Sequence, residues 1–380
     1  MIVFVAGASP IPPISGSRLR NLHLARELAK ELPVRFVTLG PVPERCDEPF
    51  DLLSAGDLPS RAVSLASSLH RPYQASRHST RALRELIASM RCTTAHASYI
   101  WSVAPARAAR APIVLDAADV ETVIAAAAVR LERRVVDRLR ARWEAAKTTR
   151  YEPARVREAA AVTVVSDADA EAMERLRARE VAVVPNGVDT RALAHQLPPA
   201  SSEIVFVASY DYRPNAAAAR ELVQEIVPRI RSQDPRVTLT LVGRHPPQDL
   251  RDLTEPWCRV TDQVPSVEPF VHAARVMIVP VRLGSGTRLK VLEAMALGVP
   301  VVATPFGLDG LGIVDGEHAL SAESLADLAQ LALRVLSDDG LAADLSVRAR
   351  HLVETRYDWS IVATPLLELH ERLGAVDGRP

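Results

Sequence analysis

The sequence predicts an α/β protein built from two doubly wound parallel sheets. Short runs of β-branched residues alternate with longer amphipathic stretches, which is the order expected of βαβ units. This order begins at residues 2–6, is interrupted by a linker rich in Pro and Ser, and restarts at residues 204–208. A chain of 380 residues also exceeds what one hydrophobic core usually serves. We therefore expect two Rossmann-like domains, 1–195 and 196–360, followed by a C-terminal helix over 361–380.

The individual elements follow from the same alternation. The stretch 119–157 is rich in Ala, Arg and Glu and has few breakers, so we expect it to be helical, and its arginines most simply indicate a solvated face. Two such sheets bind ligands at the carboxyl ends of their strands, so the default site is a cleft between facing domains. The apolar runs predict strands at 2–6, 34–38, 113–115, 162–165 and 181–184 in the first domain, and at 204–208, 237–242, 276–279 and 299–303 in the second.

The composition gives no general attraction to nucleic acid. Lys plus Arg and Asp plus Glu number 46 each, so any anionic ligand must be held by local charges. Cys46, Cys92 and Cys258 show no metal-ligand or redox spacing and are expected to be reduced thiols. The start of the chain lacks a basic region and a cleavage site, and no apolar stretch approaches the roughly 20 residues that span a bilayer. We expect a soluble, cytoplasmic protein.

One segment, residues 280–304, combines a Gly-Ser-Gly-Thr loop with a basic helix start. Glycine lets backbone N–H groups approach a ligand closely, and a helix N-terminus favours an anion, so we expect a diphosphate here. Arg288 and Lys290 would add positive charge, and Glu293 could accept hydrogen bonds from two adjacent hydroxyls, such as those of a ribose. Taken alone, the same pattern also fits a Gly-rich corner with a solvated Arg and Lys.

This segment resembles the donor-binding motif of the family-four, group 1 glycosyltransferases, which have the GT-B fold. Other segments of the chain match the family in the same order, and several spaced matches are more specific than one loop. They are 12–20, similar to the N-terminal glycine loop; 164–169, similar to a helix start; 183–189, similar to the turn before the interdomain linker; and 357–359, similar to the closing signature before the C-terminal helix.

The resemblance implies a retaining, metal-independent transferase without a cofactor. Its N-terminal domain would bind the acceptor, its C-terminal domain the nucleotide-diphosphate sugar, and its last helix would cross back to the N-terminal domain. The acceptor would be a small molecule, a lipid-linked group or a saccharide, as in polysaccharide or secondary-metabolite biosynthesis, and peripheral membrane contact is compatible with this. The expected catalytic residues are Arg288, Lys290 and Asp116, and the expected donor-binding residues are Gly16, Ser17, Arg213, Arg244, Gly284, Ser285, Gly286, Thr287, Leu289 and Glu293.

The chain departs from the family pattern at three places. Ser285 stands where the family has a Glu that touches the donor sugar, and Ser209 stands where it has an Arg. Ala118 and Asp119 stand where a related branch has a sugar-facing His and an Asn. Asp119 is then either a sugar contact or a helix cap, whereas Asp116 is expected to face the cleft. Two lost contacts to hexose hydroxyls predict a donor with an altered hexose or a pentose.

The sequence also bears on several histidines and on other functions of the same fold class. His78 and His96 lack ligand spacing and are expected to be surface or satisfied core histidines, while His245 and Arg244 could contact the nucleobase. A nucleotide-sugar 2-epimerase shares the architecture but needs acid–base groups around the sugar. A non-catalytic nucleotide-sugar-binding descendant would explain Ser285 and Ala118 but not the retained phosphate charges. A nicotinamide dehydrogenase is disfavoured because the first strand lacks a Gly-x-Gly-x-x-Gly turn.

Overall fold

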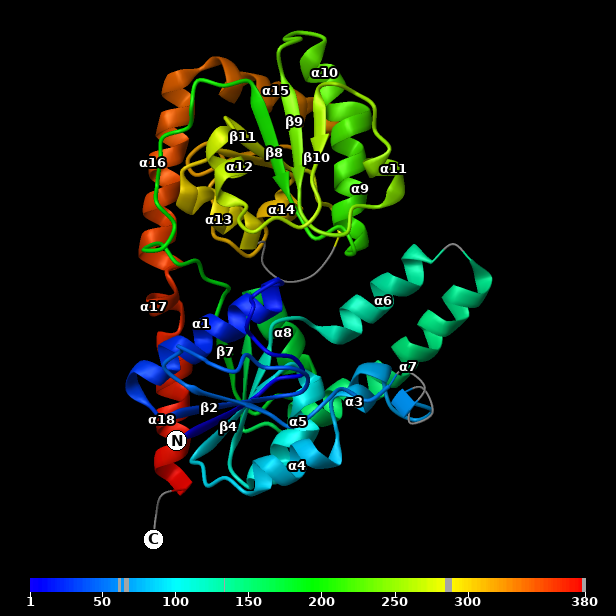
Figure 1. The fold of residues 1–380 in the computed structure, drawn as a ribbon, viewed down its shortest axis with the longest axis vertical. Coiled ribbons are helices and arrows are strands. Elements are labelled where there is room, and N and C mark those ends of the chain that lie inside the picture. Colours follow the sequence, from blue (N-terminus) through cyan, green and yellow to red (C-terminus); the bar gives the residue numbers. More distant parts are fainter. Residues whose placement is uncertain (61–62, 65–67, 133, 284–288, 378–380) are drawn as a thin grey trace. The chain divides into compact units, whose positions relative to one another are not determined.

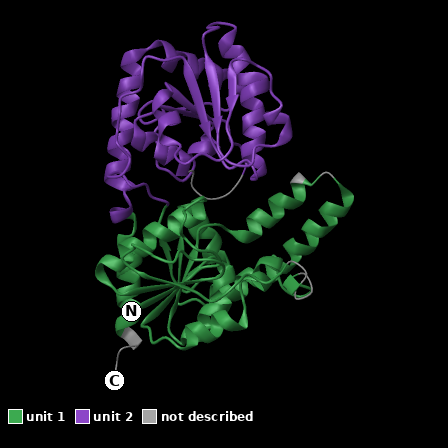
Figure 2. Ribbon diagram, in the orientation of Figure 1, with its two compact units in different colours: residues 1–185, 362–380 green, residues 186–361 purple. Residues whose placement is uncertain are grey.

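The chain forms two compact units of parallel-sheet α/β structure. The computed structural model describes residues 1–380 except 61–62, 65–67, 133, 284–288 and 378–380. Unit 1 consists of residues 1–185 and 362–380, and unit 2 of residues 186–361 (Figure 2). Each unit has its own parallel sheet with helices packed on it (Figure 1), so the predicted fold class is confirmed.

The sheet of unit 1 has the strand order β3-β2-β1-β4-β5-β6-β7, and all its pairings are parallel. Its switch point lies between β1 and β4, where the chain moves from one half of the sheet to the other. The strands are β1 (Ile2–Val5), β2 (Val34–Thr38), β3 (Asp51–Ser54), β4 (Thr94–Ser98), β5 (Ile113–Ala117), β6 (Ala161–Val164) and β7 (Val181–Val183). The helices are α1 (Gly16–Glu31), α3 (Tyr73–Arg77), α4 (Arg81–Ala88), α5 (Ile100–Ala106) with a 3₁₀ turn at Arg107–Ala109, α6 (Glu121–Leu131), α7 (Val135–Glu158), α8 (Asp167–Arg175) and α18 (Thr364–Asp377).

The sheet of unit 2 has the order β10-β9-β8-β11-β12-β13, with its switch point between β8 and β11. The two strands that flank this switch point are nearly continuous apolar runs, because both faces of the sheet are covered there. The strands are β8 (Glu203–Val207), β9 (Thr238–Val242), β10 (Cys258–Val260), β11 (Val276–Val279), β12 (Val301–Ala303) and β13 (Leu320–Ser321). The helices are α9 (Arg213–Glu221), continued by a π turn (Leu222–Ile226) and α10 (Val227–Arg231), then α11 (Gln248–Arg251), α12 (Glu268–Ala273), α13 (Leu289–Leu297), α14 (Pro305–Leu308), α15 (Leu325–Ser337), α16 (Asp339–Arg356) and α17 (Trp359–Val362).

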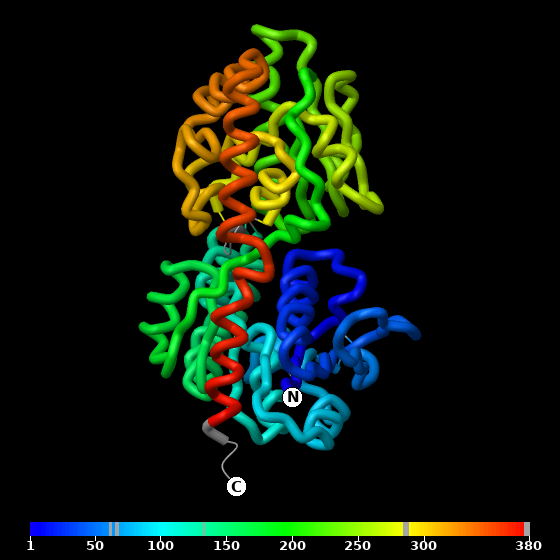
Figure 3. The backbone as a smooth tube through the Cα atoms, turned by 90° about the vertical axis from the view of Figure 1, so that its left-hand side faces the viewer, coloured from blue at the N-terminus to red at the C-terminus, as the bar shows by residue number. Residues whose placement is uncertain are grey.

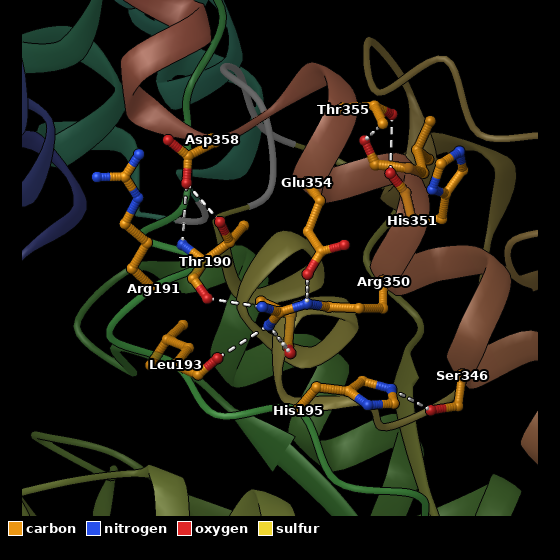
Figure 4. A network of polar contacts seen from close by, with 12 residues as sticks. Thr190, Arg191, Leu193, His195, Ser346, Arg350, His351, Glu354, Thr355 and Asp358 are labelled. Carbon is orange, nitrogen blue, oxygen red and sulfur yellow. Dashed lines mark hydrogen bonds and ion pairs between the residues drawn. The ribbon is translucent and has the colours of Figure 1, made fainter.

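The segment after Pro185 belongs to unit 2 because it is hydrogen-bonded to the end of that unit. The N–H of Val188 donates to the carbonyl of Tyr357 at 2.7 Å, and the Oγ1 of Thr190 donates to Oδ2 of Asp358 at 2.5 Å (Figure 4). Arg350 on α16 donates to the carbonyls of Thr190 and Leu193, at 2.6 and 2.8 Å. Two segments that the sequence marked separately, 183–189 and 357–359, therefore meet, and the unit boundary precedes the expected residue 195.

The C-terminal helix α18 is part of unit 1 and runs along it (red in Figure 3). It is fixed by a buried polar contact: His370 Nδ1 lies 2.8 Å from Oγ1 of Thr94, and His370 Nε2 lies 3.2 Å from Nδ1 of His96. His96 also packs against the Phe4 ring, 4.0 Å between centroids. Of the two alternatives that the sequence left open for His96, surface or core, the structure therefore shows the core.

Candidate functional site

The carboxyl end of the unit 2 sheet carries a cluster of polar side chains at the switch point. Ligands bind at such points in open parallel sheets because the flanking connections leave in opposite directions and open a crevice. The cluster comes from the loop after β8, the start of α9, the loop after β9 and the first turn of α13. Three residues predicted from sequence, Arg213, Arg244 and Lys290, lie on these segments.

Lys290 is held in place from two sides. Its Nζ donates a hydrogen bond to Oδ1 of Asn215 at 2.8 Å and lies 4.5 Å from the ring centroid of Phe206. Asn215 donates in turn from Nδ2 to the backbone carbonyl of Ser209 at 2.9 Å. Because Phe206 belongs to β8 and Asn215 to α9, the ammonium is fixed beside the end of β8. A cation fixed in this way is pre-organised for an anionic ligand.

Arg244 is oriented by Ser209, which lies in the loop after β8. Its Nε donates to Oγ of Ser209 at 2.7 Å, and Ser209 donates to Oδ1 of Asp211 at 2.5 Å. The loop after β9 can pass close to the backbone of Ala208 because it has a glycine there. Gly243 has a φ of +141°, and a Cβ added to it would lie 1.7 Å from the carbonyl oxygen of Ala208. The positive charge of Arg244 therefore stands at the same edge of the sheet as Lys290.

Glu293 lies one turn into α13 and is half-buried. Burial raises the pKa of its carboxyl to about 7, and the nearby Lys290 ammonium lowers it only in part. A carboxyl with a perturbed pKa beside a fixed cation is a functional candidate. At pH 8 it would be ionised and able to accept hydrogen bonds from hydroxyls.

For the remaining residues predicted to bind the donor, the structure gives the element and the exposure. Arg213 opens α9 and is exposed, Leu289 opens α13 and is half-buried, and His245 is exposed with Nδ1 3.7 Å from Oδ2 of Asp211. Their contacts with a donor stay predictions. Five predicted residues lie outside the described part of the chain: Gly284, Ser285, Gly286, Thr287 and Arg288.

Unit 1 has a pocket of about 280 Å³ at the carboxyl ends of β1 and β4, the strands that flank its switch point. Ser17 of α1 lines it, as does the buried Asn21, which accepts a hydrogen bond from Oγ of Ser98 at 2.8 Å. Gly16 is exposed at the start of α1 and is not part of the lining. A larger hollow of about 570 Å³ in unit 2 lies at the amino ends of β8 and β9, beside Glu203, and therefore away from the switch-point edge.

Glu121 is a residue of the unit 1 pocket that was not predicted from the sequence. The pKa of its carboxyl is raised to about 8, chiefly by burial and then by the charges of Asp119 and Glu152, while a hydrogen bond from Trp101 opposes the rise. That bond runs from Nε1 of Trp101 to Oε1 of Glu121 at 3.2 Å. At neutral pH the carboxyl is therefore protonated and can both donate and accept. In the sequence Glu121 is only an acidic first residue of a helix, which is common.

His78 was expected at the surface or in the core, and it lies in the lining of the unit 1 pocket. Its ring approaches the backbone of Gly7 so closely that a Cβ added there would lie 2.5 Å from it. Burial lowers the pKa of His78 to about 4, and the charge of Arg77 contributes. The imidazole is consequently neutral at physiological pH and can accept a hydrogen bond from a ligand.

Asp116 is buried inside unit 1 as the counter-ion of Arg20. Arg20 donates from Nε and Nη2 to the two carboxylate oxygens at 2.9 and 2.7 Å, and Thr163 donates to Oδ1 at 2.8 Å. Burial favours a raised pKa for Asp116, but Arg20 outweighs it and the pKa is lowered. Arg20 also donates to the carbonyls of Val184 and Pro185, both at 2.8 Å. The expectation of an open, cleft-facing carboxylate is thus corrected: Asp116 positions Arg20, which holds the end of β7.

The start of α6 is capped from another helix. Val120 occupies the cap position without a side-chain cap bond, and the Glu152 carboxylate of α7 accepts hydrogen bonds from the N–H groups of Glu121 and Thr122 at 2.8 and 2.9 Å. The capping role considered for Asp119 is filled by Glu152. Ala118 is buried at the end of β5. In the part of the chain that the structure describes, no three His, Cys, Asp or Glu residues form a group able to hold a metal ion.

Comparison with known proteins places both units in one family. The model of the Glycosyltransferase Family 4 domain matches residues 14–192, and that of the Glycosyl transferases group 1 domain matches residues 201–338. A phosphatidyl-myo-inositol mannosyltransferase of Mycobacterium leprae is 29% identical over 201 residues, which cover 50% of this chain and 52% of that protein. The match thus spans about half the length of that relative.

Solved structures agree in fold over nearly the whole chain. Sucrose-phosphate synthase from Thermosynechococcus elongatus has a TM-score of 0.75 at 20% identity and covers 99% of both chains. HepE from Anabaena, in complex with UDP and glucose, has a TM-score of 0.67 at 16% identity and covers 98% of this chain and 99% of its own. The predicted GT-B type of fold is thereby confirmed. With both halves matched in sequence and the whole in fold, the chain belongs to the group 1, family 4 glycosyltransferases.

Proposed function

We propose that the protein moves a sugar from a nucleotide-diphosphate donor to an acceptor hydroxyl, with retention of configuration and without a metal ion. The observation that carries this proposal is the fixed ammonium of Lys290 at the switch point of unit 2, held by Asn215 and Phe206. In the sequence Lys290 follows the loop predicted to hold a diphosphate, and it lies one turn before Glu293 on α13. This edge of the sheet is where the fold class binds nucleotides.

The chemistry follows from the charges at this edge. Lys290 and Arg244 would stabilise the negative charge that grows on the diphosphate as the sugar–oxygen bond breaks, with Arg213 and Arg288 adding to it. Glu293 would accept hydrogen bonds from the ribose hydroxyls. The acceptor oxygen attacks the anomeric carbon on the face that the diphosphate leaves, and the departing phosphate takes the acceptor proton. No nucleophilic side chain is required, and the protein's task is orientation and charge stabilisation.

The unit 1 pocket is proposed as the acceptor site. Its hydroxyl, amide and protonated carboxyl groups (Ser17, Asn21 and Glu121) suit a polyhydroxylated ligand, because they can both donate and accept hydrogen bonds. The indole of Trp101 adds an apolar surface of the kind that packs on a sugar ring. The complex of HepE with UDP and glucose supports UDP-hexoses as the first donors to test. The mannosyltransferase relative supports testing inositol lipids among the acceptors.

A panel of nucleotide sugars tests this function directly. We expect release of nucleoside diphosphate from one donor class, stimulated by an acceptor, with the anomeric configuration of the donor kept in the product by NMR. EDTA should leave the rate unchanged. Loss of turnover in EDTA with recovery in magnesium or manganese would overturn metal independence, and an inverted product would overturn retention. Conversion of the donor to its 2-epimer without transfer would show that the protein is a nucleotide-sugar 2-epimerase instead.

The donor sugar itself is proposed to be altered. Ala118 and Ser285 replace two family residues that hold polar groups of an ordinary hexose. A site with those two residues rejects a deoxygenated sugar, because its own polar side chains would be left unpaired. A site without them has no such reason to reject it. Competitive turnover with matched hexose and deoxyhexose donors checks this. The proposal of an altered donor sugar would be defeated if the wild-type chain clearly preferred the fully hydroxylated sugar and if neither Ala118→His nor Ser285→Glu reversed that preference.

A further inference from the structure

The hairpin of α6 and α7 leaves apolar side chains in solvent. The two helices pack on each other within unit 1, and Figure 1 shows them reaching away from its sheet. The buried residues of α7 lie in its second half, at Lys147, Thr148, Glu152 and Val156. In the first half, four large apolar side chains are 57% to 61% exposed: Val135, Val136, Leu139 and Trp143. We call these four residues the apolar stripe.

The apolar stripe lies on one face of α7. The spacings from Val136 to Leu139 and from Leu139 to Trp143 are three and four residues, which place side chains above one another on an α-helix. Scattered exposed apolar residues are ordinary at a protein surface, but a contiguous patch of them indicates an interaction site. Valine, leucine and tryptophan together form an apolar surface with an aromatic ring that suits a membrane interface.

Arginines flank the stripe on both sides. At 100° per residue, Arg140 falls on one side of it, and Arg138 and Arg142 fall on the other; all three are exposed. In the sequence of residues 130–143, six arginines stand against only Glu132 and Asp137 as acidic residues. The chain as a whole has no net charge, so this local excess of positive charge is a property of the hairpin.

We propose that the α6–α7 hairpin docks on the surface of a membrane that contains anionic lipid, with the apolar stripe in the interface and the flanking arginines on the headgroups. Charge selects this occupant. A second copy that met the first stripe to stripe would bring the two sets of arginines together, and like charges disfavour that contact. An anionic lipid surface satisfies both features at once. Among the described residues no helix is long and apolar enough to cross a membrane, so the contact would be with the surface.

This inference goes beyond the proposed transfer reaction, because none of the hairpin residues that carry it belongs to the candidate donor or acceptor site. The docking would place the transfer reaction at a membrane surface, where a lipid-linked acceptor would be found. It can fail while the transfer reaction stands, because binding is measured without donor or acceptor.

Co-sedimentation of the full chain with lipid vesicles tests the docking. The probes are vesicles of phosphatidylcholine alone and of phosphatidylcholine mixed with phosphatidylglycerol. One variant removes the stripe (Val136→Ser, Leu139→Ser, Trp143→Ser) and another removes the charge (Arg138→Gln, Arg140→Gln, Arg142→Gln). Matched controls change exposed residues of unit 2: Leu197→Ser, Val314→Ser and Val347→Ser for the apolar change, and Arg229→Gln, Arg236→Gln and Arg348→Gln for the charge change.

The wild-type chain should bind the anionic vesicles, more weakly at high salt, and bind phosphatidylcholine vesicles poorly. Each hairpin variant should lose about tenfold or more in partitioning, while both controls bind as the wild type does. Circular dichroism checks that the variants are folded. We expect them to be folded because the substituted side chains are exposed. Absence of wild-type binding, or equal binding by the hairpin variants, would overturn the proposal. A wild-type dimer in analytical ultracentrifugation that the stripe variant abolishes would assign the surface to a second copy instead.

Discussion

The Nζ of Lys290 and the Oδ1 of Asn215 are 75 residues apart in the sequence and lie 2.8 Å apart in the structure. Asn215 also holds the backbone of Ser209, so one amide links the first turn of α13 to the loop after β8. These two connections flank the switch point of unit 2. The amide therefore positions the cation that the proposed function places on the donor diphosphate.

Removing this amide should weaken nucleotide binding without unfolding the chain. Asn215 positions the ammonium and does not itself bind the ligand, so Asn215→Ala should lower affinity less than Lys290→Ala does, by up to roughly tenfold or about 1.4 kcal/mol. The double variant Asn215→Ala/Lys290→Ala should be no weaker than Lys290→Ala alone, because both act through the same ammonium. Calorimetric titration of the three variants measures the coupling. Additive losses would show that Asn215 acts independently of Lys290.

Nucleotide binding should depend on the protonation of Glu293. Its pKa is raised to about 7, so the carboxylate that accepts ribose hydroxyls is formed mainly above that pH. Affinity for a nucleoside diphosphate should therefore rise between about pH 6 and pH 8. The ligand's own phosphate titrates in this range, so Glu293→Gln serves as the reference and should give a flatter profile. Parallel profiles for the two proteins would remove Glu293 from the binding site.

The ion pair of Arg20 and Asp116 should contribute to stability rather than to turnover. Removal of one partner leaves a buried charge unpaired, which costs about 3–5 kcal/mol, so Asp116→Ala should lower the free energy of unfolding by this amount. Replacement of both, Arg20→Met/Asp116→Leu, should cost less. Urea denaturation measures both effects. A folded Asp116→Asn variant with unchanged stability and strongly reduced turnover would restore the direct catalytic role expected from the sequence.

The contact between α18 and β4 should make unit 1 sensitive to acid. Burial lowers the pKa of His96 to about 4, with Asp116 raising and Arg20 lowering it, and burial together with His96 lowers the pKa of His370. The unfolded chain then binds protons at these histidines below about pH 6.5 while the folded chain does not, so stability is lost as the pH falls from about 6.5 toward 4. At pH 5 the loss from one histidine is about 2 kcal/mol.

Urea denaturation at pH 7.5 and pH 5 checks this dependence. His370→Leu should reduce the difference between the two pH values, whereas the exposed His351→Leu should leave it unchanged. An acid sensitivity that persists in full without His370 would place its origin elsewhere in the chain.

Most of the apolar strands could be predicted from the sequence, because strands covered on both faces of a parallel sheet usually read as continuous apolar runs. The run 276–279 matches β11 residue for residue, and 34–38 matches β2. The strands not predicted are short or carry small and polar residues: β4 reads Thr-Ala-His-Ala-Ser, and β3 lies at the edge of its sheet with partly exposed residues. Local pattern gives no signal for such strands, which depend on their neighbours in the sheet.

The candidate site could be predicted only where a motif is contiguous. Lys290 and Glu293 stand in one helix start, and the motif named both. Arg20 meets Asp116 across 96 residues of sequence, and Trp101 meets Glu121 from a different helix, so neither relationship has a local signal. The raised pKa of Glu121 arises from burial, from Asp119 two residues earlier, and from Glu152, which the fold brings to it from α7.

Titration of the protein with nucleoside diphosphates tests the central claim most directly. Calorimetry with UDP, GDP, ADP and dTDP should show that at least one of them binds the wild-type chain. Lys290→Ala should weaken that binding by about ten- to a hundredfold, the value of a charge-assisted hydrogen bond, with an unchanged midpoint of thermal unfolding in the absence of ligand. Failure of every nucleotide to bind, or equal affinity in the folded Lys290→Ala variant, would contradict a diphosphate site at the switch point of unit 2.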